Sequence, residues 1–172
     1  AIDVSALAGA QGGMRIYLEE LLKELARIDQ KNDYWLYLAR WRDLAGAEEQ
    51  FPALNNPRFK RCLRRFPFRL LMNLENRLGL RVQERWLLPP ADLFHGACQT
   101  VPPLSKMRSV ITVHHFEEMR YTHISDWDNF YYWQVYKNSV ERSDRVIADS
   151  QYTRRYLQET FKLPEEKISV IY

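Results

Sequence analysis

The chain has 172 residues, of which 46% are hydrophobic and 27% charged, and its formal net charge is +3. This is long enough for one domain with a substantial core, and the composition is ordinary for a globular protein. No apolar run approaches the roughly 20 residues that cross a bilayer, and no signal-peptide pattern opens the sequence. Cys62 and Cys98 have no metal-binding spacing and suit the reducing cytoplasm.

The first half of the chain predicts three strands and two long helices, with a small-residue loop between the first strand and the first helix. The predicted strands are Ile2–Leu7, Tyr34–Leu38 and Phe59–Phe66. The predicted helices are Met14–Ile28, which carries its apolar residues on one face, and Phe68–Leu88, which Gly79 weakens at its centre.

The second half of the chain continues the alternation of short apolar strands with helices. Four strands are expected at Asp92–Gly96, Val110–His115, Arg145–Asp149 and Ile168–Tyr172. Helices are expected at Trp127–Ser143 and at Gln151–Phe161, the second with Ser150 as its N-cap. The alternation predicts an α/β fold, with a Rossmann-like, doubly wound and mostly parallel sheet of about seven strands.

The loop that contains Gly12 and Gly13 joins a strand to a helix. That arrangement offers free backbone N–H groups and a helix N-terminus to an anion. The loop lacks Gly-x-Gly-x-x-Gly spacing, so either phosphate binding or a simple tight turn accounts for the two glycines.

Two histidines end the apolar run of residues 110–113. Ligands of open α/β sheets bind outside the carboxyl ends of the strands, so His114 and His115 are candidates for chemistry. Adjacent strand residues point to opposite faces, which leaves one of them in the cleft and argues against a metal site shared by both. His95 and Ser150, at the ends of neighbouring strands, are further candidates for this cleft.

A basic window spans residues 58–85, with nine basic residues against two acidic ones. One interpretation is a solvated surface. The other is contact with an anionic membrane surface or a phosphorylated acceptor, through Arg61, Arg64, Arg65 and Arg69. No nucleic-acid recognition module is visible, so nucleic acid is not the expected partner.

Several motifs occur in the order found in a known family. They are Gly12-Gly13-Met14 opening a helix, the strand before His114, the segment Ser143–Ser150, and the segment Leu163–Tyr172. In this order they resemble the N-terminal half of GT-B glycosyltransferases of family 4. The resemblance covers nearly the whole chain and is weakest between Trp41 and Trp86.

The resemblance implies two Rossmann-like domains that face each other across a cleft. Residues 1–172 would be the N-terminal, acceptor-side domain, and a C-terminal domain of the same enzyme would hold most of the donor. It implies transfer of a sugar from a nucleotide-sugar donor to a glycan or lipid-linked acceptor with retention of configuration. The expected location is the cytoplasm, with association at the inner face of a membrane if the basic window contacts it. The nucleotide sugar is a substrate, and neither a cofactor nor a metal is expected. Without the second domain we expect no activity.

The resemblance also assigns roles to individual residues. It implies that Gly12 and Gly13 approach the donor diphosphate and the acceptor, and that His114 reaches the transferred sugar. Two positions depart from the family pattern: His115 stands where aspartate is common, and Arg15 stands where some members have a further glycine. Two alternatives are a stand-alone Rossmann-like module that binds an anionic ligand and a basic peripheral membrane adaptor.

Overall fold

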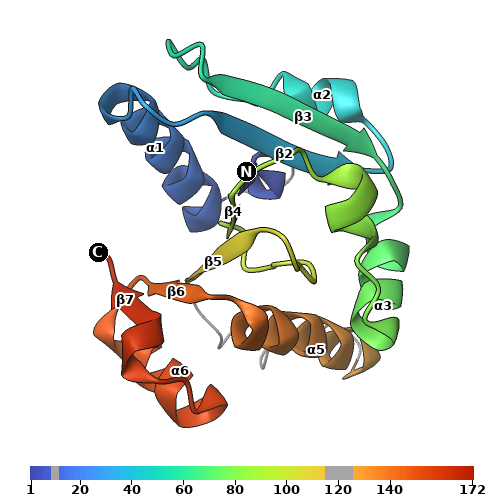
Figure 1. Cartoon of the computed structure of the whole chain (residues 1–172), viewed down its shortest axis with the longest axis vertical. Coiled ribbons are helices and arrows are strands. Elements are labelled where there is room, and N and C mark those ends of the chain that lie inside the picture. The colour runs from blue at the N-terminus through green and yellow to red at the C-terminus, as the bar shows by residue number, and fades with distance from the viewer. Residues whose placement is uncertain (9–11, 115–125) are drawn as a thin grey trace.

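Seven parallel strands form one open sheet with helices on both faces (Figure 1). The structure, a computed structural model, describes residues 1–8, 12–114 and 126–172, with the backbone alone for residues 45, 68–70, 73, 76 and 126–132. Every neighbouring pair in the order β3-β2-β1-β4-β5-β6-β7 is parallel. The strands are β1 (Ile2–Asp3), β2 (Tyr34–Arg40), β3 (Phe59–Arg65), β4 (Leu93–Gly96), β5 (Arg108–Val113), β6 (Arg145–Ala148) and β7 (Ile168–Val170). The expected Rossmann-like, doubly wound architecture is confirmed.

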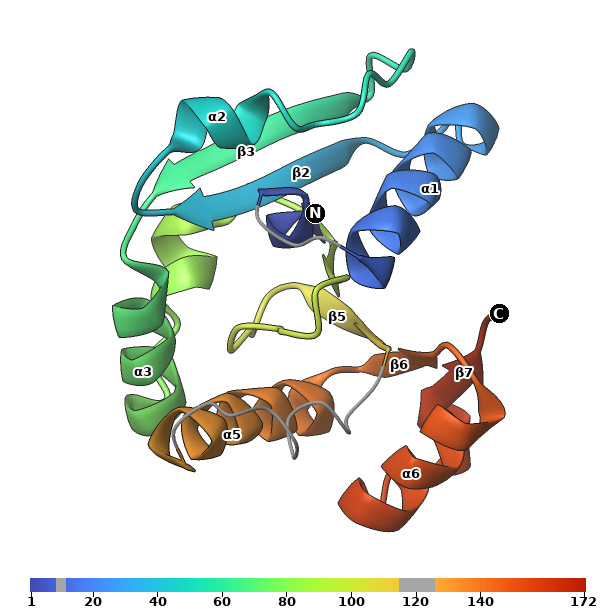
Figure 2. The same ribbon diagram turned by 180° about the vertical axis from the view of Figure 1, so that it is seen from behind.

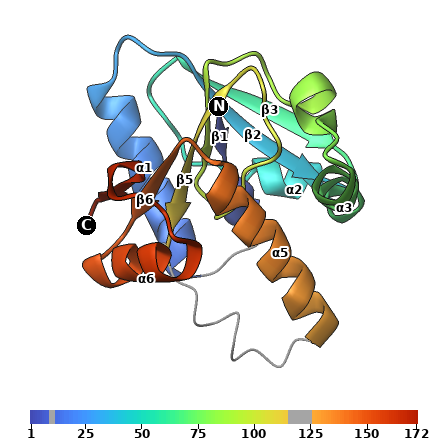
Figure 3. The ribbon, with the colours of Figure 1, turned by 60° about the horizontal axis from the view of Figure 1, so that its bottom comes forward.

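The helices divide between the two faces of this sheet (Figures 1 and 2). Helices α1 (Gly13–Ile28) and α2 (Leu44–Glu48) cover one face, where Leu18, Leu22 and Ala47 pack against Leu36 and Leu38 of β2. Helices α5 (Asp126–Arg142) and α6 (Gln151–Phe161) cover the other face over β5 and β6, and α3 (Phe68–Leu78) lies beside α5. Figure 3 shows α5 and α6 beside each other beneath the strands.

The first strand is shorter than the expected Ile2–Leu7. Only Ile2 and Asp3 pair with β2, and a 3₁₀-helix η1 (Ser5–Ala8) follows. The side chain of Asp3 causes the change, because its Oδ1 accepts the backbone N–H of Ser5 at 2.9 Å and turns the chain. The apolar residues of this stretch are buried in the turn instead of in a strand.

The expected single helix Phe68–Leu88 is wrong, because the chain forms two pieces. Helix α3 ends at Leu78, and its C-cap Gly79 has φ 64°, the left-handed conformation that stops a helix. A single π-helical turn η2 (Gln83–Leu87) follows. The buried carboxylate of Glu75 joins the two pieces by accepting the N–H and the side-chain amide of Gln83, each at 2.6 Å. The two pieces therefore remain packed as one unit.

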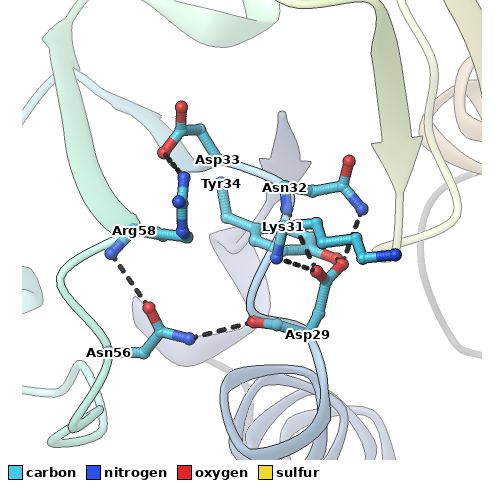
Figure 4. A network of polar contacts seen from close by, with 7 residues as sticks. All are labelled: Asp29, Lys31, Asn32, Asp33, Tyr34, Asn56 and Arg58. Atoms are coloured by element: carbon cyan, nitrogen blue, oxygen red, sulfur yellow. Dashed lines mark hydrogen bonds and ion pairs between the residues drawn. The ribbon is translucent and has the colours of Figure 1, made fainter.

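A polar network closes the amino-terminal ends of β2 and β3 (Figure 4). The carboxylate of Asp29 accepts the Tyr34 hydroxyl at 2.6 Å and the Asn32 amide at 2.7 Å. Buried Asn56 donates to the carbonyls of Asp29 at 3.1 Å and Ala26 at 3.0 Å, and accepts the N–H of Arg58 at 3.0 Å. One amide side chain thus ties the end of α1 to the start of β3.

Replacing Asn56 with alanine should lower the free energy of unfolding by about 1–3 kcal/mol, because it leaves buried backbone groups without their partner. Urea denaturation followed by circular dichroism measures the change. The exposed neighbour Asn55 provides the control, and Asn55→Ala should unfold like the wild type. Equal stability of the two variants would contradict the role given to Asn56.

Candidate functional site

The candidate site lies at the carboxyl edge of the sheet, next to the point where the strand order reverses. That reversal falls between β1, which leads to η1 and the glycine loop, and β4. Crevices at such switch points are where doubly wound folds bind ligands. His114 directly follows β5, one strand further along, so it lies at the same edge.

The glycines at the start of α1 leave the helix N-terminus open. Gly12, the N-cap residue, has φ 114° and ψ −160°, a conformation that strains any side chain, and no side chain caps the helix. Gly12 and Gly13 are both exposed, and a Cβ added at either would meet no atom within 4 Å. Among the described residues, no side chain caps the first N–H groups of α1, which lie at the positive end of the helix dipole.

Two arginines hold the turn that precedes this loop. Arg15 donates from Nη1 to the carbonyl of Leu7 at 3.1 Å and to the side chain of Gln50 at 3.0 Å, and it pairs with Glu19. Arg40 donates to the carbonyl of Ala8. Both contacts fix the end of η1. The side chain of Arg15 thus makes intramolecular contacts, and a contact of Arg15 with an acceptor stays a prediction.

Tyr17 connects the first turns of α1 with His114. Its ring meets the His114 ring edge-on, with 4.5 Å between the centroids and 71° between the planes. Tyr17 lies four residues after Gly13, about 6 Å along the helix axis, so His114 lies close to the open N-terminus of α1. The structure thereby brings together the two glycines and the first histidine.

A chain of hydrogen bonds continues beneath Tyr17. Its hydroxyl is bonded to Oγ1 of buried Thr112 at 3.0 Å, and Nε2 of His95 is bonded to the same oxygen at 2.8 Å. Thr112 and His114 are two residues apart in the extended chain and so share a face. Three elements, α1, β4 and β5, are locked together by this chain of bonds.

Two buried groups at the switch point have displaced pKa values. Burial lowers the pKa of His95 to about 4, and the positive charges of the amino terminus and of His114 act in the same direction. Burial raises the pKa of Asp3 to about 6, against the hydrogen bonds from Ser5. At neutral pH, His95 is therefore an uncharged ring, whereas Asp3 is ionised in spite of its burial.

The other candidate residues for the cleft lie as follows. Ser150 caps α6 at the end of β6, where its Oγ accepts the N–H of Thr153 at 3.1 Å and contacts the Thr153 hydroxyl at 2.9 Å. Ser150 thus lies at the same edge with its hydroxyl engaged in the cap. The expected loop was Phe116–Asp126. His115 and residues 116–125 of that loop lie outside the described residues.

Three of the four arginines proposed for an anionic surface lie on the edge strand β3, and the fourth, Arg69, lies on α3. Arg61 pairs with Glu48 at 3.2 Å, Arg64 donates to the Leu87 carbonyl at 3.1 Å, and Arg65 donates to the Trp41 carbonyl at 3.2 Å. The side chain of Arg69 is outside the described part. Charged residues on an edge strand prevent that strand from pairing with other chains. This role accounts for the row of arginines on β3 without a bound anionic ligand.

Neither a metal centre nor a membrane span is found in the described part of the chain. No cluster of three or more histidine, cysteine, aspartate or glutamate residues within residues 1–8, 12–114 and 126–172 is placed to hold a metal ion. Among the same residues, no helix is both long and apolar enough to cross a membrane.

Comparison with known proteins identifies the family. The model of Glycosyltransferase Family 4 matches residues 11–172, which is nearly the whole chain. The chain belongs to glycosyltransferase family 4. This membership indicates glycosyl transfer as the general chemistry, with a sugar donor and an acceptor as the substrates. No curated protein and no solved structure gives a significant match.

Two residues of this candidate site, Tyr17 and Thr112, escaped the sequence reasoning. Tyr17 lies on the apolar face of α1 between Met14 and Leu21, where its hydroxyl is out of place. Thr112 is likewise the polar residue inside the run before His114. A polar atom on each of two facing apolar surfaces is a signal that the two surfaces bond to each other.

The displaced pKa values predict opposite pH dependences for two variants. His95 has an ordinary pKa of 6.5 and a folded pKa of about 4, so the unfolded chain binds the extra proton between these values. As pH falls through this range, the wild type should lose on the order of 2 kcal/mol of unfolding free energy relative to His95→Gln. Urea denaturation at a series of pH values measures the difference.

Asp3 supplies the control of opposite sign. Its folded pKa of about 6 exceeds its ordinary 3.8, so the folded chain binds the extra proton in this range. Relative to Asp3→Asn, the wild type should therefore gain stability as pH falls. If the unfolding free energies of the wild type and of one variant changed in parallel with pH, the pKa of the replaced group would not be displaced in the folded chain.

Proposed function

We propose that this chain is the acceptor-side domain of a retaining glycosyltransferase that moves a sugar from a nucleotide-sugar donor to a glycan or lipid-linked acceptor. The observation that carries the proposal is the contact between Tyr17 and His114, which sets an imidazole beside the open N-terminus of α1. A hydrogen-bonding side chain next to backbone N–H groups that no described side chain caps suits a substrate that has both hydroxyls and phosphates.

The glycine loop has the properties needed to stabilise the leaving group. Negative charge builds up on a nucleoside diphosphate as the bond between the sugar and the phosphate breaks. Backbone N–H groups and the positive end of the α1 dipole favour that charge. Because Gly12 and Gly13 carry no side chains, the backbone can approach a phosphate closely. The Arg15 and Arg40 contacts hold the preceding turn in place during this step.

In this proposal His114 contacts the transferred sugar. An imidazole N–H at the strand end would donate a hydrogen bond to a sugar hydroxyl and hold the anomeric carbon toward the acceptor. Tyr17 acts as a positioning residue, because its ring packs on His114 and its hydroxyl anchors it to Thr112. His95, on the neighbouring strand β4, is bonded to the same Thr112 oxygen.

We further propose that the donor nucleotide is held mainly by a second Rossmann-like domain on the other side of the cleft. The described edge offers backbone N–H groups and the imidazoles of His114 and His95. The cleft would close between the two domains, with the acceptor on the side of this chain. No resident metal or cofactor takes part in the proposed reaction.

In the complete enzyme, His114→Ala should lower kcat by about 10²–10³-fold, because a hydrogen bond to the reacting sugar is lost. The wild-type enzyme is first tested with UDP-glucose, UDP-N-acetylglucosamine and GDP-mannose. Release of nucleoside diphosphate from the donor that it uses then measures kcat for the wild type and the variant. The anomeric proton coupling of the product, measured by NMR, should match that of the donor. Inversion would reject the retaining mechanism.

The matched control is Tyr17→Phe, which keeps the ring against His114 and removes the bond to Thr112. It should lower kcat by less than about ten-fold. Near-normal turnover of His114→Ala, with the fold intact by circular dichroism, would refute the role of His114.

The chain of residues 1–172 on its own should fold cooperatively and release no nucleoside diphosphate from these three donors, because the proposed donor domain is missing. Adding the segment that follows it in the complete enzyme should restore turnover. Sugar transfer by the isolated chain would contradict the proposal that a second domain holds the donor nucleotide.

A further inference from the structure

The end of β2 lies level with His114 at the carboxyl edge of the sheet. A row of paired residues crosses β2, β1, β4 and β5, and it consists of Leu36, Ile2, His95 and Val110. Arg40 follows Leu36 by four residues, and His114 follows Val110 by four. Each strand residue advances the chain by about 3.3 Å, so Arg40 and His114 stand at the same height above this row.

The two strands between them end lower. Strand β1 ends at Asp3 and β4 ends at Gly96, each one residue beyond the row. Strand β2 runs three residues past Tyr37, the partner of Asp3, and stays paired with β3 up to Arg65. The β2–β3 pair therefore projects about 10 Å beyond the end of β1. Three strand spacings, about 14 Å, separate the end of β2 from His114.

The turn of residues 41–43, which we call the Trp41 turn, follows β2 and lies beside the glycine loop. Arg40 directly precedes the turn and donates to the carbonyl of Ala8. Ala8 is the last residue of η1, and the loop with Gly12 and Gly13 follows it. The Trp41 turn therefore belongs to the same edge of the sheet as the N-terminus of α1.

The backbone of the Trp41 turn is held at both ends. Arg65 donates from Nε to the carbonyl of Trp41 at 3.2 Å. The carboxylate of Asp43 accepts the N–H of Gly46, in α2, at 3.2 Å. A turn that is held in this way presents its side chains to a ligand at a low cost in conformational entropy.

Two side chains of the Trp41 turn are exposed. The ring of Trp41 is 56% exposed. Arg42 is exposed as well, and within the described residues its side chain makes no hydrogen bond or ion pair. Of the acidic residues that follow, Asp43 is bonded to α2, and Glu48 pairs with Arg61 at 3.2 Å. The turn thus presents a large apolar ring next to a positive charge that has no ion-pair partner in the described part of the chain.

We propose that the Trp41 turn binds the acceptor beyond the reacting sugar, and that this acceptor is an oligosaccharide with a carboxylate or phosphate group. The proposal rests on the proposed function, since it extends the acceptor side of the same edge. The apolar face of a sugar ring packs on an indole, and a guanidinium pairs with an anionic group. A single sugar at His114 would not reach Trp41, which follows a strand end about 14 Å away. The acceptor therefore has several sugars.

The charge of Arg42 decides between an acidic and a neutral glycan. A neutral glycan on Trp41 would cover the neighbouring guanidinium without giving it an anionic partner, which costs free energy. An acidic glycan satisfies both side chains. Contact of Trp41 with a second domain is the competing explanation, and the experiment below separates it from acceptor binding.

Isothermal titration calorimetry on the 172-residue chain tests the proposal with acidic and neutral tetrasaccharides. The acidic probes are the tetrasaccharides of galacturonate, mannuronate and hyaluronan, and the neutral probes are maltotetraose and cellotetraose. The chain should bind at least one acidic probe more tightly than both neutral ones. Trp41→Ala should weaken that binding about ten-fold, because roughly 60 Å² of apolar contact with a sugar ring is lost.

Arg42→Gln should weaken the same binding about three-fold at low salt, because an exposed ion pair is lost. In about 1 M NaCl the Debye length falls to about 3 Å, so the wild type and Arg42→Gln should then bind the probe alike. Trp41→Phe keeps an aromatic ring and should retain most of the affinity. Circular dichroism verifies that each variant keeps the fold.

Two matched controls remove the same groups elsewhere. Trp86→Ala removes a tryptophan that is 69% exposed, and Lys31→Gln removes an exposed positive charge. Lys31 precedes β2 and Trp86 precedes β4, so both lie toward the amino ends of the strands. Both control variants should bind the acidic probe as the wild type does.

Three binding results would overturn the proposal. They are no binding of any acidic probe, equal binding of the neutral probes, and wild-type affinity in Trp41→Ala. Undiminished binding by Trp41→Ala, with an equal loss of turnover for every acceptor in the complete enzyme, would assign Trp41 to the second domain instead. Failure of the proposed function looks different. Binding of an acidic probe through Trp41, with no sugar transfer by the complete enzyme, would reject glycosyl transfer and leave glycan binding by the Trp41 turn intact.

Discussion

The packing of Tyr17 between α1 and β5 is the contact on which the candidate site depends. A helix that follows the first strand of a doubly wound sheet can dock at many angles on an apolar face. The hydrogen bond from Tyr17 to Thr112 and the ring contact with His114 select one of them. This docking sets the open N-terminus of α1 beside the end of β5. The glycine loop and His114, far apart in sequence, thereby become neighbours.

Much of the fold could be predicted from the sequence, because short apolar runs mark most strands and an apolar face marks helices such as α1. The two errors, at Ile2–Leu7 and Phe68–Leu88, have local causes. Asp3 turns the chain through its own carboxylate, and Gly79 adopts a left-handed conformation. The sequence also indicated His114 and the glycines by their position in the topology. The polar atoms of Tyr17 and Thr112 on apolar surfaces were a signal, but the sequence could not pair them, because a bond between elements depends on the docking angle.

The two edges of the sheet have different chemistry. The carboxyl edge presents backbone N–H groups, a histidine and a neutral buried imidazole, which suits the making and breaking of glycosidic bonds in a family 4 glycosyltransferase. The amino ends of β5 and β6 present a cavity whose wall includes the basic side chains Arg81, Lys106, Arg108 and Arg142.

The central claim is that Tyr17 acts on glycosyl transfer through His114. A double-mutant cycle of Tyr17→Ala and His114→Ala in the complete enzyme, with kcat/KM as the readout, tests it most directly. Once His114 is replaced, the further replacement of Tyr17 should lower kcat/KM by less than about three-fold, although Tyr17→Ala alone costs far more. Additive losses from the two replacements would show that the residues act independently and would contradict the account.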